Sequence, residues 1–282
     1  MPKVSVLLLT YKSNPEYLKK SLNSALNQSF RDLEVLIIDD GPGDHNDEII
    51  DQFKERDKRV NIVKNKQRMG RLKCRNLGIK KAKGEYIAVL DSDDYWCDEK
   101  KLEKQVNFLE NHSKWGAIGT AMVLIDDKDR EIGKVKYPVL NEEIRKCMLA
   151  SFQMAHPSVM FRKSVTAKIG GYSESKVLKF AEDYDFFLKV GRHYKLANLS
   201  DYCLKYRIHS GSGSTANEFK QRLTGILLTV KYFGQYPKGT SALVKKIVTM
   251  FLPRKIMDEL IAKNKLFSKI YSKTTGINKQ IK

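Results

Sequence analysis

The first ninety residues alternate between two patterns of apolar and polar positions. Continuous apolar runs without helical spacing are typical of strands buried on both faces of a sheet, and they predict strands at 4–9, 33–40, 60–65 and 85–90. Apolar residues spaced three and four apart predict helices at 13–28, 47–57 and 70–84. Three strand–helix repeats of this kind indicate a right-handed, parallel α/β sheet.

The second half of the chain has a more mixed pattern. Strands are expected at 115–126, 133–140, 156–163 and 196–209, and helices at 99–112, 141–150 and 181–194. A loop rich in Gly and Ser follows at 210–217. The tail from 215 to 282 is helical in pattern and carries 14 Lys and Arg residues against 3 Asp and Glu residues, a large share of the net charge of +19. Such a basic segment implies an anionic partner.

Cysteine usage and hydropathy bear on the compartment. The four cysteines are far apart and form no CxxC pair, which argues against a zinc site or a disulfide framework. The apolar run at the N-terminus is too short for a secretion signal, and no window approaches eighteen apolar residues. We therefore expect a cytoplasmic protein without a membrane span.

Polar side chains gather where three of the predicted strands end. Thr10 and Tyr11 follow the first strand, Asp39 and Asp40 end the second, and Asp91 follows the fourth. The carboxyl ends of parallel strands open at one edge of a sheet, and ligands of such folds bind there. We therefore expect these side chains to share one site.

The stretch AVLDSDDYW, at residues 88–96, crowds three carboxylates into four residues. Acids this close repel one another, so a compensating positive group is required. One explanation is a turn in which Asp and Ser accept nearby backbone N–H groups. The other is Mg2+ or Mn2+, which takes one or two carboxylates together with substrate phosphates. The pattern alone leaves both explanations open.

The neighbouring residues have similar alternatives. Tyr11 either packs as an ordinary aromatic or stacks on a base, and Asp39 and Asp40 either cap a turn or accept hydrogen bonds from a pyrimidine or a ribose. Trp96 either packs in the core or lines a sugar pocket, where an aromatic face suits a sugar ring.

Five segments taken together resemble family 2 of the inverting glycosyltransferases, in the order usual for that family: VSVLLLTYKS, SLNSALNQSFRDLEVLIIDDG, GRLKCRNLGIKKAKGEYIAVLDSDD, HPSVMFRK and AEDYDFFLKV. The resemblance covers residues 4–214. It implies an α/β fold of the GT-A type, a Rossmann-like α/β/α sandwich with a mixed, mainly parallel sheet. Residues 1–100 are then the nucleotide-sugar-binding half, 101–214 the acceptor-binding half, and 215–282 a basic amphipathic helical extension.

The resemblance also implies which side chains bind the nucleotide of a nucleotide-diphospho-sugar, most simply a UDP-sugar. They are Thr10, Tyr11, Asp39, Asp40, Arg71, Arg75 and Asp91. Within this set Tyr11 faces the base, Asp40 meets the uracil edge and Asp39 supports it. Asp91 and Asp93 form the DxD element that holds Mn2+ or Mg2+, and His209 is a candidate third ligand.

For catalysis, the resemblance implies that Asp183 is the general base and that Glu182 assists it and contributes to the sugar or acceptor pocket. Without the resemblance, both acids are explained by the preference for negative charge at a helix N-terminus. Trp96 is expected in the same pocket. An acceptor hydroxyl loses its proton to Asp183 as it attacks the anomeric carbon, so a single displacement inverts that centre.

Charge and loop composition bear on three rival functions. A nucleotidyltransferase usually has a Gly-rich basic loop after its first strand, whereas LTYKSNPEY contains no glycine; a sugar-nucleotide-binding protein without transfer stays open. Carboxylates at the sheet edge would repel a phosphate backbone, so we expect no nucleic-acid partner. The leading hypothesis is transfer to a hydroxyl of a surface glycan or lipid-linked acceptor.

Two interpretations of the tail remain. It either packs on the catalytic domain with a solvated lysine face, or lies on the anionic cytoplasmic face of a membrane as a peripheral contact.

Overall fold

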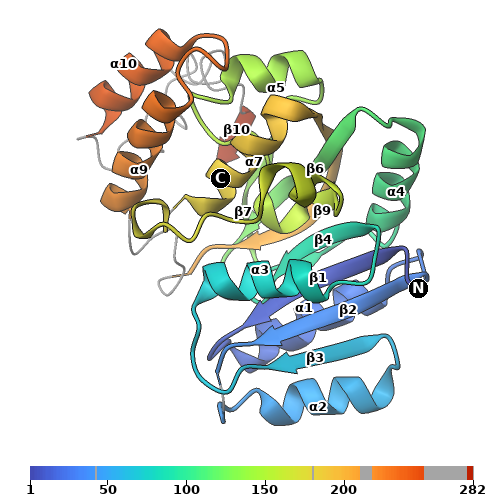
Figure 1. Ribbon diagram of the computed structural model, residues 1–282. Helices are drawn as coiled ribbons and strands as arrows, with labels where there is room; N and C mark the ends of the chain where they lie inside the picture. Colours follow the sequence, from blue (N-terminus) through green and yellow to red (C-terminus); the bar gives the residue numbers. More distant parts are fainter. Residues whose placement is uncertain (42, 180, 210–217, 251–277, 282) are drawn as a thin grey trace.

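The computed structural model describes residues 1–41, 43–179, 181–209, 218–250 and 278–281. Its centre is one ten-stranded β-sheet with helices on both faces (Figure 1). The strands follow the order β10-β7-β6-β8-β4-β1-β2-β3, and β9 pairs with β6 and β5 beside this path. The predicted loop at 210–217 and the tail segment 251–277 lie outside the described residues.

The first half of the chain is a regular strand–helix alternation. Its elements are β1 (Val4–Thr10), α1 (Pro15–Leu26), β2 (Leu33–Asp39), α2 (Asp47–Arg56), β3 (Val60–Lys64), α3 (Arg71–Lys81) and β4 (Tyr86–Asp91). Strands β3, β2, β1 and β4 are neighbours in that order, and each pair is parallel. The predicted parallel α/β sheet is confirmed.

The second half adds antiparallel strands. Its elements are β5 (Tyr95–Trp96), α4 (Lys101–Asn111), β6 (Trp115–Ile125), β7 (Glu131–Lys136), α5 (Asn141–Cys147), η1 (His156–Ser158), β8 (Met160–Arg162), α6 (Val165–Ile169), η2 (Lys176–Leu178), α7 (Glu182–His193) and β9 (Lys195–Arg207). β8 lies antiparallel between β4 and β6, and β9 runs parallel to β6. The strand predicted at 156–163 begins instead as a 3-10 turn, because Pro157 has no N–H for a sheet ladder.

The apolar runs are continuous because each central strand is covered on both faces. In β1, Val6 and Leu8 belong to one core cluster, which includes residues of α1, α2 and α4. Leu7 points to the opposite face and belongs to the second cluster, which includes residues of α3, α5 and α7. Alternate side chains thus enter different cores, and no polar position is needed within the strand.

The strand register brings the chemistry-bearing strand ends together. Thr10 is paired with Asp39 across β1 and β2, and Leu9 is paired with Asp91 across β1 and β4. All these positions therefore lie at one edge of the sheet, as the alternation predicts.

The described tail packs on the second half of the fold. Helix α9 (Glu218–Lys231) lies against α7, where Lys231 Nζ and Tyr232 Oη lie 2.7 Å and 2.9 Å from Asp185 Oδ1. Helix α10 (Gly239–Thr249) packs on α9. Strand β10 (Asn278–Ile281) pairs antiparallel with β7, so the expectation of a wholly helical tail is wrong at this segment. No helix in the described ranges is long and apolar enough to cross a bilayer.

Candidate active site

A cleft of about 1190 Å³ opens where the central strands end. This volume exceeds the range of about 300–1,000 Å³ that is usual for one small ligand, so the cleft has room for more than one small ligand. Both Asp93, after β4, and Asp183, at the start of α7, line it. Acidic residues 90 positions apart in the chain thus open onto one shared space.

The carboxylates after β4 have different surroundings. Asp93 Oδ2 lies 3.1 Å from His209 Nε2, at the cleft surface. Asp91 also lines the cleft; removal from water raises the pKa of its carboxyl, and Arg75 opposes that rise from 3.7 Å. Asp94 is buried and accepts the backbone N–H of Arg207 at 2.7 Å. Asp94 is thus bonded to the end of β9, while Asp91 and Asp93 line the cleft; the explanation by Mg2+ or Mn2+ stays a prediction.

The N-terminus of α7 also lines the cleft, through Glu182 and Asp183. Glu182 is buried; its Oε1 accepts from Arg75 Nη1 at 2.6 Å and forms an ion pair with Arg71 Nε at 2.8 Å. Its Oε2 is also buried and has no hydrogen-bond partner among the described residues. Burial raises the pKa of Asp183 to about 6, the Glu182 charge adds to the rise, and Arg75 opposes it. A carboxyl with this pKa is ionised at neutral pH yet remains an effective proton acceptor.

Arg75 contacts the imidazole of His156, which in turn contacts the hydroxyl of Tyr172. Its Nη2 lies 3.4 Å from His156 Nδ1, and His156 Nε2 is 3.0 Å from the Tyr172 hydroxyl. Burial and the positive charge of Arg75 lower the pKa of His156 well below its usual value, so its ring is neutral. The neutral His156 ring therefore helps to position Arg75, and its two ring nitrogens contact the side chains of Arg75 and Tyr172.

The wall at β1 presents Thr10 and Tyr11. The Thr10 hydroxyl bonds Ser13 Oγ at 3.0 Å, while Tyr11 is 37% exposed and its ring faces the Arg68 guanidinium at 4.1 Å. The Tyr11 ring is thus accessible to a planar ligand, and it also forms a cation–π contact with the Arg68 guanidinium. Lys12, the next residue, is in a left-handed conformation with φ 49° and also lines the cleft.

The two aspartates after β2 are tied into the protein. Asp40 lines the cleft, and its oxygens accept from Asn65 Nδ2 at 2.9 Å, Met69 N at 2.6 Å and Gly70 N at 2.7 Å. Burial opposes ionisation of Asp40, but these bonds hold its pKa below the usual range. Asp39 is buried outside the cleft lining, where burial raises its pKa to about 6. Asp39 accepts the Gly41 N–H at 3.0 Å and so supports the turn that follows Asp40; its implied place in the nucleotide site stays a prediction.

The expectation for Trp96 is corrected. Its ring is 4% exposed in the core, its indole N–H donates to Pro157 O at 2.9 Å, and Lys101 Nζ lies 3.8 Å from its ring centroid. It is not among the cleft-lining residues. The strand β5 pairing with β9 turns the ring inward, a tertiary effect that the local pattern does not carry.

Several cleft residues were not anticipated from the sequence. Arg68, His45 and Tyr17 all line it, from the loop before α3, the loop after β2 and helix α1. Each is an isolated polar or aromatic residue away from the polar clusters at the strand ends, so no pattern in the sequence distinguishes it. Arg207, which contacts the Asp93 loop, stands two positions before His209 in the sequence YRIH. Its closeness to this candidate metal ligand is the one signal in the sequence that points to a role for Arg207 near the site.

The donor atoms at the sheet edge fit a shared divalent ion. The described part of the chain has no group of three or more His, Cys, Asp or Glu side chains that could hold a metal by itself. Asp93 and His209 are nevertheless adjacent, and Asp91 lines the same cleft. Mg2+ needs only one or two carboxylates when phosphates and water supply the other ligands, and carboxylate oxygens suit Mn2+ as well.

Comparison with known sequences agrees with this geometry. Residues 5–170 match the sequence profile described as Glycosyl transferase family 2. The UDP-Glc:alpha-D-GlcNAc-diphosphoundecaprenol beta-1,3-glucosyltransferase of Escherichia coli is 31% identical over 224 residues, which cover 78% of this chain and 83% of that protein.

Solved structures share the fold. Staphylococcus aureus TarS 1-349 in complex with UDP-GlcNAc superposes with a TM-score of 0.67 at 20% identity, over 95% of this chain and 77% of that one. The mannosyltransferase PcManGT of Pyrobaculum calidifontis, in complex with GDP-Man and Mn2+, gives a TM-score of 0.65 at 14% identity, over 98% and 80%. At these identities the likeness establishes the GT-A architecture.

Proposed function

The chain belongs to glycosyl transferase family 2 and is a glycosyltransferase, and we propose that it transfers a sugar from a UDP-sugar, with inversion, to a hydroxyl of a surface glycan or lipid-linked acceptor. One observation carries the proposal. Asp93 and Asp183 line the same cleft from the sheet edge and from α7. In this arrangement Asp93 serves the leaving diphosphate and Asp183 is the base for the attacking hydroxyl, with the reacting carbon between them.

Asp183 is the general base of the proposal. The acceptor O–H proton passes to its carboxylate as the oxygen forms a bond to the anomeric carbon. The bond from that carbon to the diphosphate oxygen breaks, and the electron pair leaves with the nucleoside diphosphate. With a pKa raised to about 6, Asp183 is ionised at pH 7 and more basic than an exposed aspartate.

Positive charge stabilises the leaving group from the protein side. Arg71 and Arg75 line the cleft between Glu182 and the sheet edge, where they offer hydrogen bonds to a diphosphate. Mn2+ or Mg2+, held by Asp91, Asp93 and His209, would neutralise the charge that develops on that diphosphate.

The nucleoside is assigned to the wall at β1 and β2. A base would stack on the exposed Tyr11 ring beside Arg68, and Thr10 and Asp40 would lie at its edge. Asp40 already accepts three N–H groups, so its ionised carboxylate would accept one further hydrogen bond, donated by the base. The E. coli relative uses UDP-Glc, and the TarS complex holds UDP-GlcNAc; both favour a uridine donor.

The acceptor is assigned to the side of the cleft formed by α7 and the second half of the sheet. Glu182, which is held by its ion pairs with Arg71 and Arg75, lines this side of the cleft. Tyr137 and Phe152 line it too and add apolar surface. The E. coli relative is named for an acceptor that is linked to diphosphoundecaprenol. A lipid-linked acceptor would bring this enzyme to a membrane surface.

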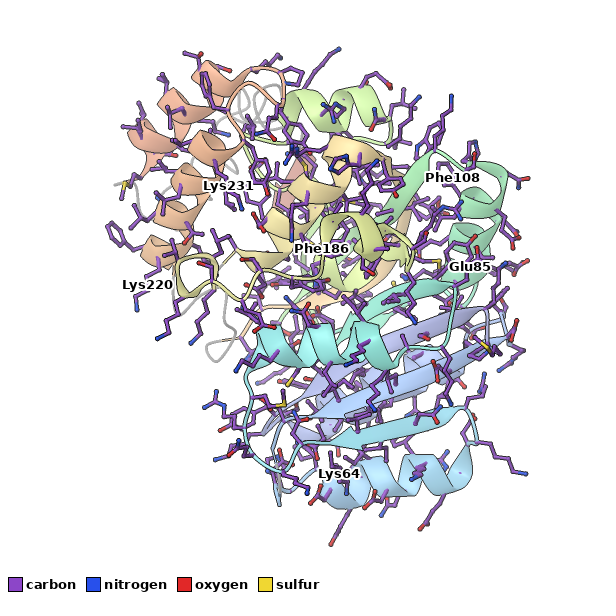
Figure 2. The ribbon with its side chains drawn as sticks, viewed as in Figure 1. Lys64, Glu85, Phe108, Phe186, Lys220 and Lys231 are labelled. Carbon is purple, nitrogen blue, oxygen red and sulfur yellow. The ribbon has the colours of Figure 1, made fainter. Side chains whose placement is uncertain are left out.

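The outer side of α9 fits such a peripheral contact. Four apolar side chains spaced along one side of the helix are exposed, Phe219, Leu223, Leu227 and Val230, and we call this set the α9 stripe. Lys220 lies beside it in the first turn of α9, at the periphery of the molecule (Figure 2). Gln221, from the same turn, lines the cleft. An apolar strip with adjacent basic residues is typical of helices that lie on anionic lipid.

A panel of nucleotide sugars, with and without Mn2+ or Mg2+, tests the proposal. Thermal stability and donor hydrolysis are measured for each pair. A UDP-sugar is expected to raise the melting temperature only when metal is present. Equal stabilisation without metal, or by a nucleotide that lacks the diphosphate, would contradict the assignment.

A further inference from the structure

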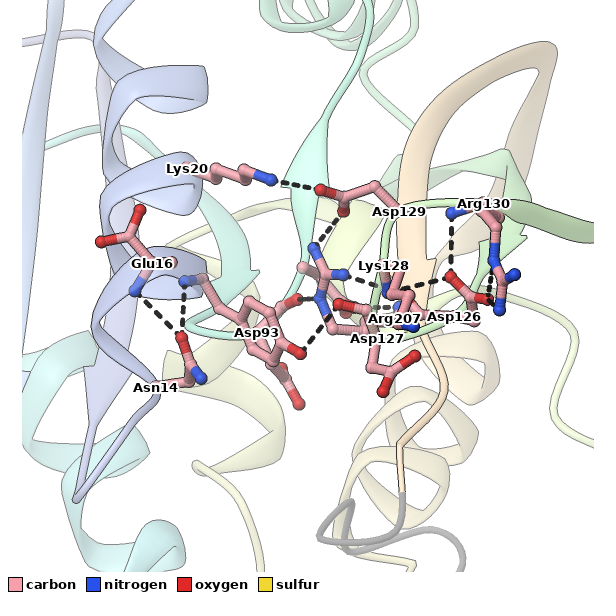
Figure 3. A network of polar contacts seen from close by, with 12 residues as sticks. Asn14, Glu16, Lys20, Asp93, Asp126, Asp127, Lys128, Asp129, Arg130 and Arg207 are labelled. Carbon is pink, nitrogen blue, oxygen red and sulfur yellow. Dashed lines mark hydrogen bonds and ion pairs between the residues drawn. The ribbon is translucent and has the colours of Figure 1, made fainter.

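Arg207, at the end of β9, lies at the centre of a polar network that joins separate segments of the chain (Figure 3). Its Nε donates to the carbonyl oxygen of Asp93 at 3.0 Å, and its backbone N–H donates to Asp94 Oδ1 at 2.7 Å. Its Nη1 donates to the carbonyl oxygen of Asp126 at 2.9 Å, and its Nη2 forms an ion pair with Asp129 Oδ1 at 2.5 Å.

The side chain of Arg207 is fully buried, although it carries a charge. Such a charge is tolerated when its donors are satisfied in fixed directions. The guanidinium also lies 3.9 Å from the Tyr17 ring centroid on α1. Tyr17 in turn donates its hydroxyl to Asp127 O at 3.2 Å, and its ring centroid is 6.0 Å from that of His209.

These contacts meet at Asp93, at the edge of the sheet. The Asp93 backbone is held from one side by Arg207, and its carboxylate is met by His209 at 3.1 Å. Arg207 and His209 are two residues apart on the same segment. The end of β9 therefore sets the position of Asp93 through both its backbone and its side chain.

We propose that Arg207 is a positioning residue for the metal and diphosphate site: it fixes the backbone of Asp93 so that the carboxylate lies beside His209, and it anchors this loop to the turn 126–130. The proposal rests on the proposed function, because it assigns a role toward the ion that Asp93 would hold. Arg207 itself touches neither the substrate nor the ion in this account.

The planar guanidinium is what makes this role specific. It donates in three directions at once, to the Asp93 carbonyl, the Asp126 carbonyl and the Asp129 carboxylate. A lysine at this position keeps the charge, but its flexible ammonium cannot reproduce the fixed fork of donors. Arg207→Lys is therefore expected to free the Asp93 loop while the buried charge is kept.

Mn2+ binding to the full-length protein tests the proposal, measured from the electron paramagnetic resonance signal of free Mn2+ in the presence of UDP. Arg207→Lys should weaken Mn2+ binding by about tenfold, since loss of a residue that orients a metal ligand typically costs 10- to 100-fold. The Mn2+ concentration for half-maximal activity should rise by a similar factor, while kcat at saturating Mn2+ changes little.

Two matched variants separate positioning from general stability. Asp129→Asn weakens the Nη2 ion pair, together with the ion pair between Asp129 and Lys20 of α1, but leaves the bond from Arg207 to the Asp93 carbonyl in place. It should reduce Mn2+ affinity by a smaller factor, about threefold. Arg130→Gln removes a neighbouring arginine that bonds Asp126 but does not contact Asp93, and it should bind Mn2+ as the wild type does. Thermal unfolding without metal is measured for each variant.

The outcomes are distinct. Mn2+ affinity within twofold of wild type in a folded Arg207→Lys protein overturns the proposal. If that variant does not fold, Asp129→Asn decides, and an unchanged affinity there overturns it. Asp93→Asn is included as a reference: if it too binds Mn2+ as the wild type does, the metal site of the proposed function has failed, and the role of Arg207 fails with it.

Discussion

Arg75 Nη1 lies 2.6 Å from Glu182 Oε1, and both side chains are almost fully buried. This ion pair joins α3 to the first residue of α7. Because Asp183 is the next residue, every change at Glu182 alters the electrostatic environment of the proposed base. The Glu182 charge is part of the reason that the pKa of Asp183 is raised to about 6.

Glu182→Gln should therefore shift the pH dependence of the reaction. The neutral amide no longer repels the Asp183 anion, while Arg71 and Arg75 still attract it, so the pKa of Asp183 falls. The acidic limb of the kcat/KM profile should move to lower pH, by about one unit. Glu174→Gln, on the surface of the loop before α7, is the matched control. A limb that stays in place or moves to higher pH would contradict the arrangement.

A second prediction concerns Lys101, which is fully buried against Trp96 and whose ammonium donates to Gln105 Oε1 at 2.8 Å. Burial lowers the pKa of Lys101 to about 7. The unfolded chain then binds more protons than the folded one between about pH 7 and pH 10.5, so the stability of the wild type rises with pH in that window.

Lys101→Met should remove this penalty and raise the free energy of unfolding at pH 7 by about 1–3 kcal/mol. The gain should shrink at pH 9, where the wild-type lysine is already neutral in the folded state. Denaturant unfolding at both pH values measures it, with the half-exposed Lys104→Met as control. A variant that is less stable than wild type at pH 7 would show that the contacts of Lys101 outweigh the cost of its burial.

A third prediction tests the α9 stripe as a membrane contact. Leu223→Ser combined with Leu227→Ser should reduce binding of the full chain to phosphatidylglycerol vesicles by at least about tenfold, since each exposed leucine would bury apolar surface in the lipid. Flotation is the measurement, at low and high salt. Leu140→Ser removes an even more exposed leucine outside this helix and should have no effect. Vesicle binding that the double substitution leaves unchanged would rule out the stripe.

Much of the first half of the sheet could be predicted because its information is local. Apolar runs covered on both faces define β1, β2 and β4, and parallel pairing then forces Thr10, Asp39 and Asp91 to one edge. The pairing of Asp93 with Asp183 across a cleft was expected only through the family resemblance. Spacing in the sequence does not determine which loop of the second half faces the first.

The errors arise where the surroundings of a side chain decide its direction. Trp96 follows the acidic loop and would suit a sugar, but the carbonyl of Pro157 and the ammonium of Lys101 hold it in the core. Asp39 and Asp40 are adjacent, yet only Asp40 lines the cleft. Arg207 looks like an ordinary strand residue until β9 is placed beside the Asp93 loop.

The central claim is that Asp93 serves the diphosphate and Asp183 serves the acceptor from opposite walls of one cleft. Calorimetric titration of UDP in the presence of Mn2+, together with steady-state turnover, separates the two roles. Asp183→Asn should bind UDP within about twofold of wild type while turnover falls by about 100-fold or more, and Asp93→Asn should lose the metal-dependent part of UDP binding. Loss of UDP affinity in Asp183→Asn to the same extent as in Asp93→Asn, or turnover that survives the Asp183 substitution, would contradict the account.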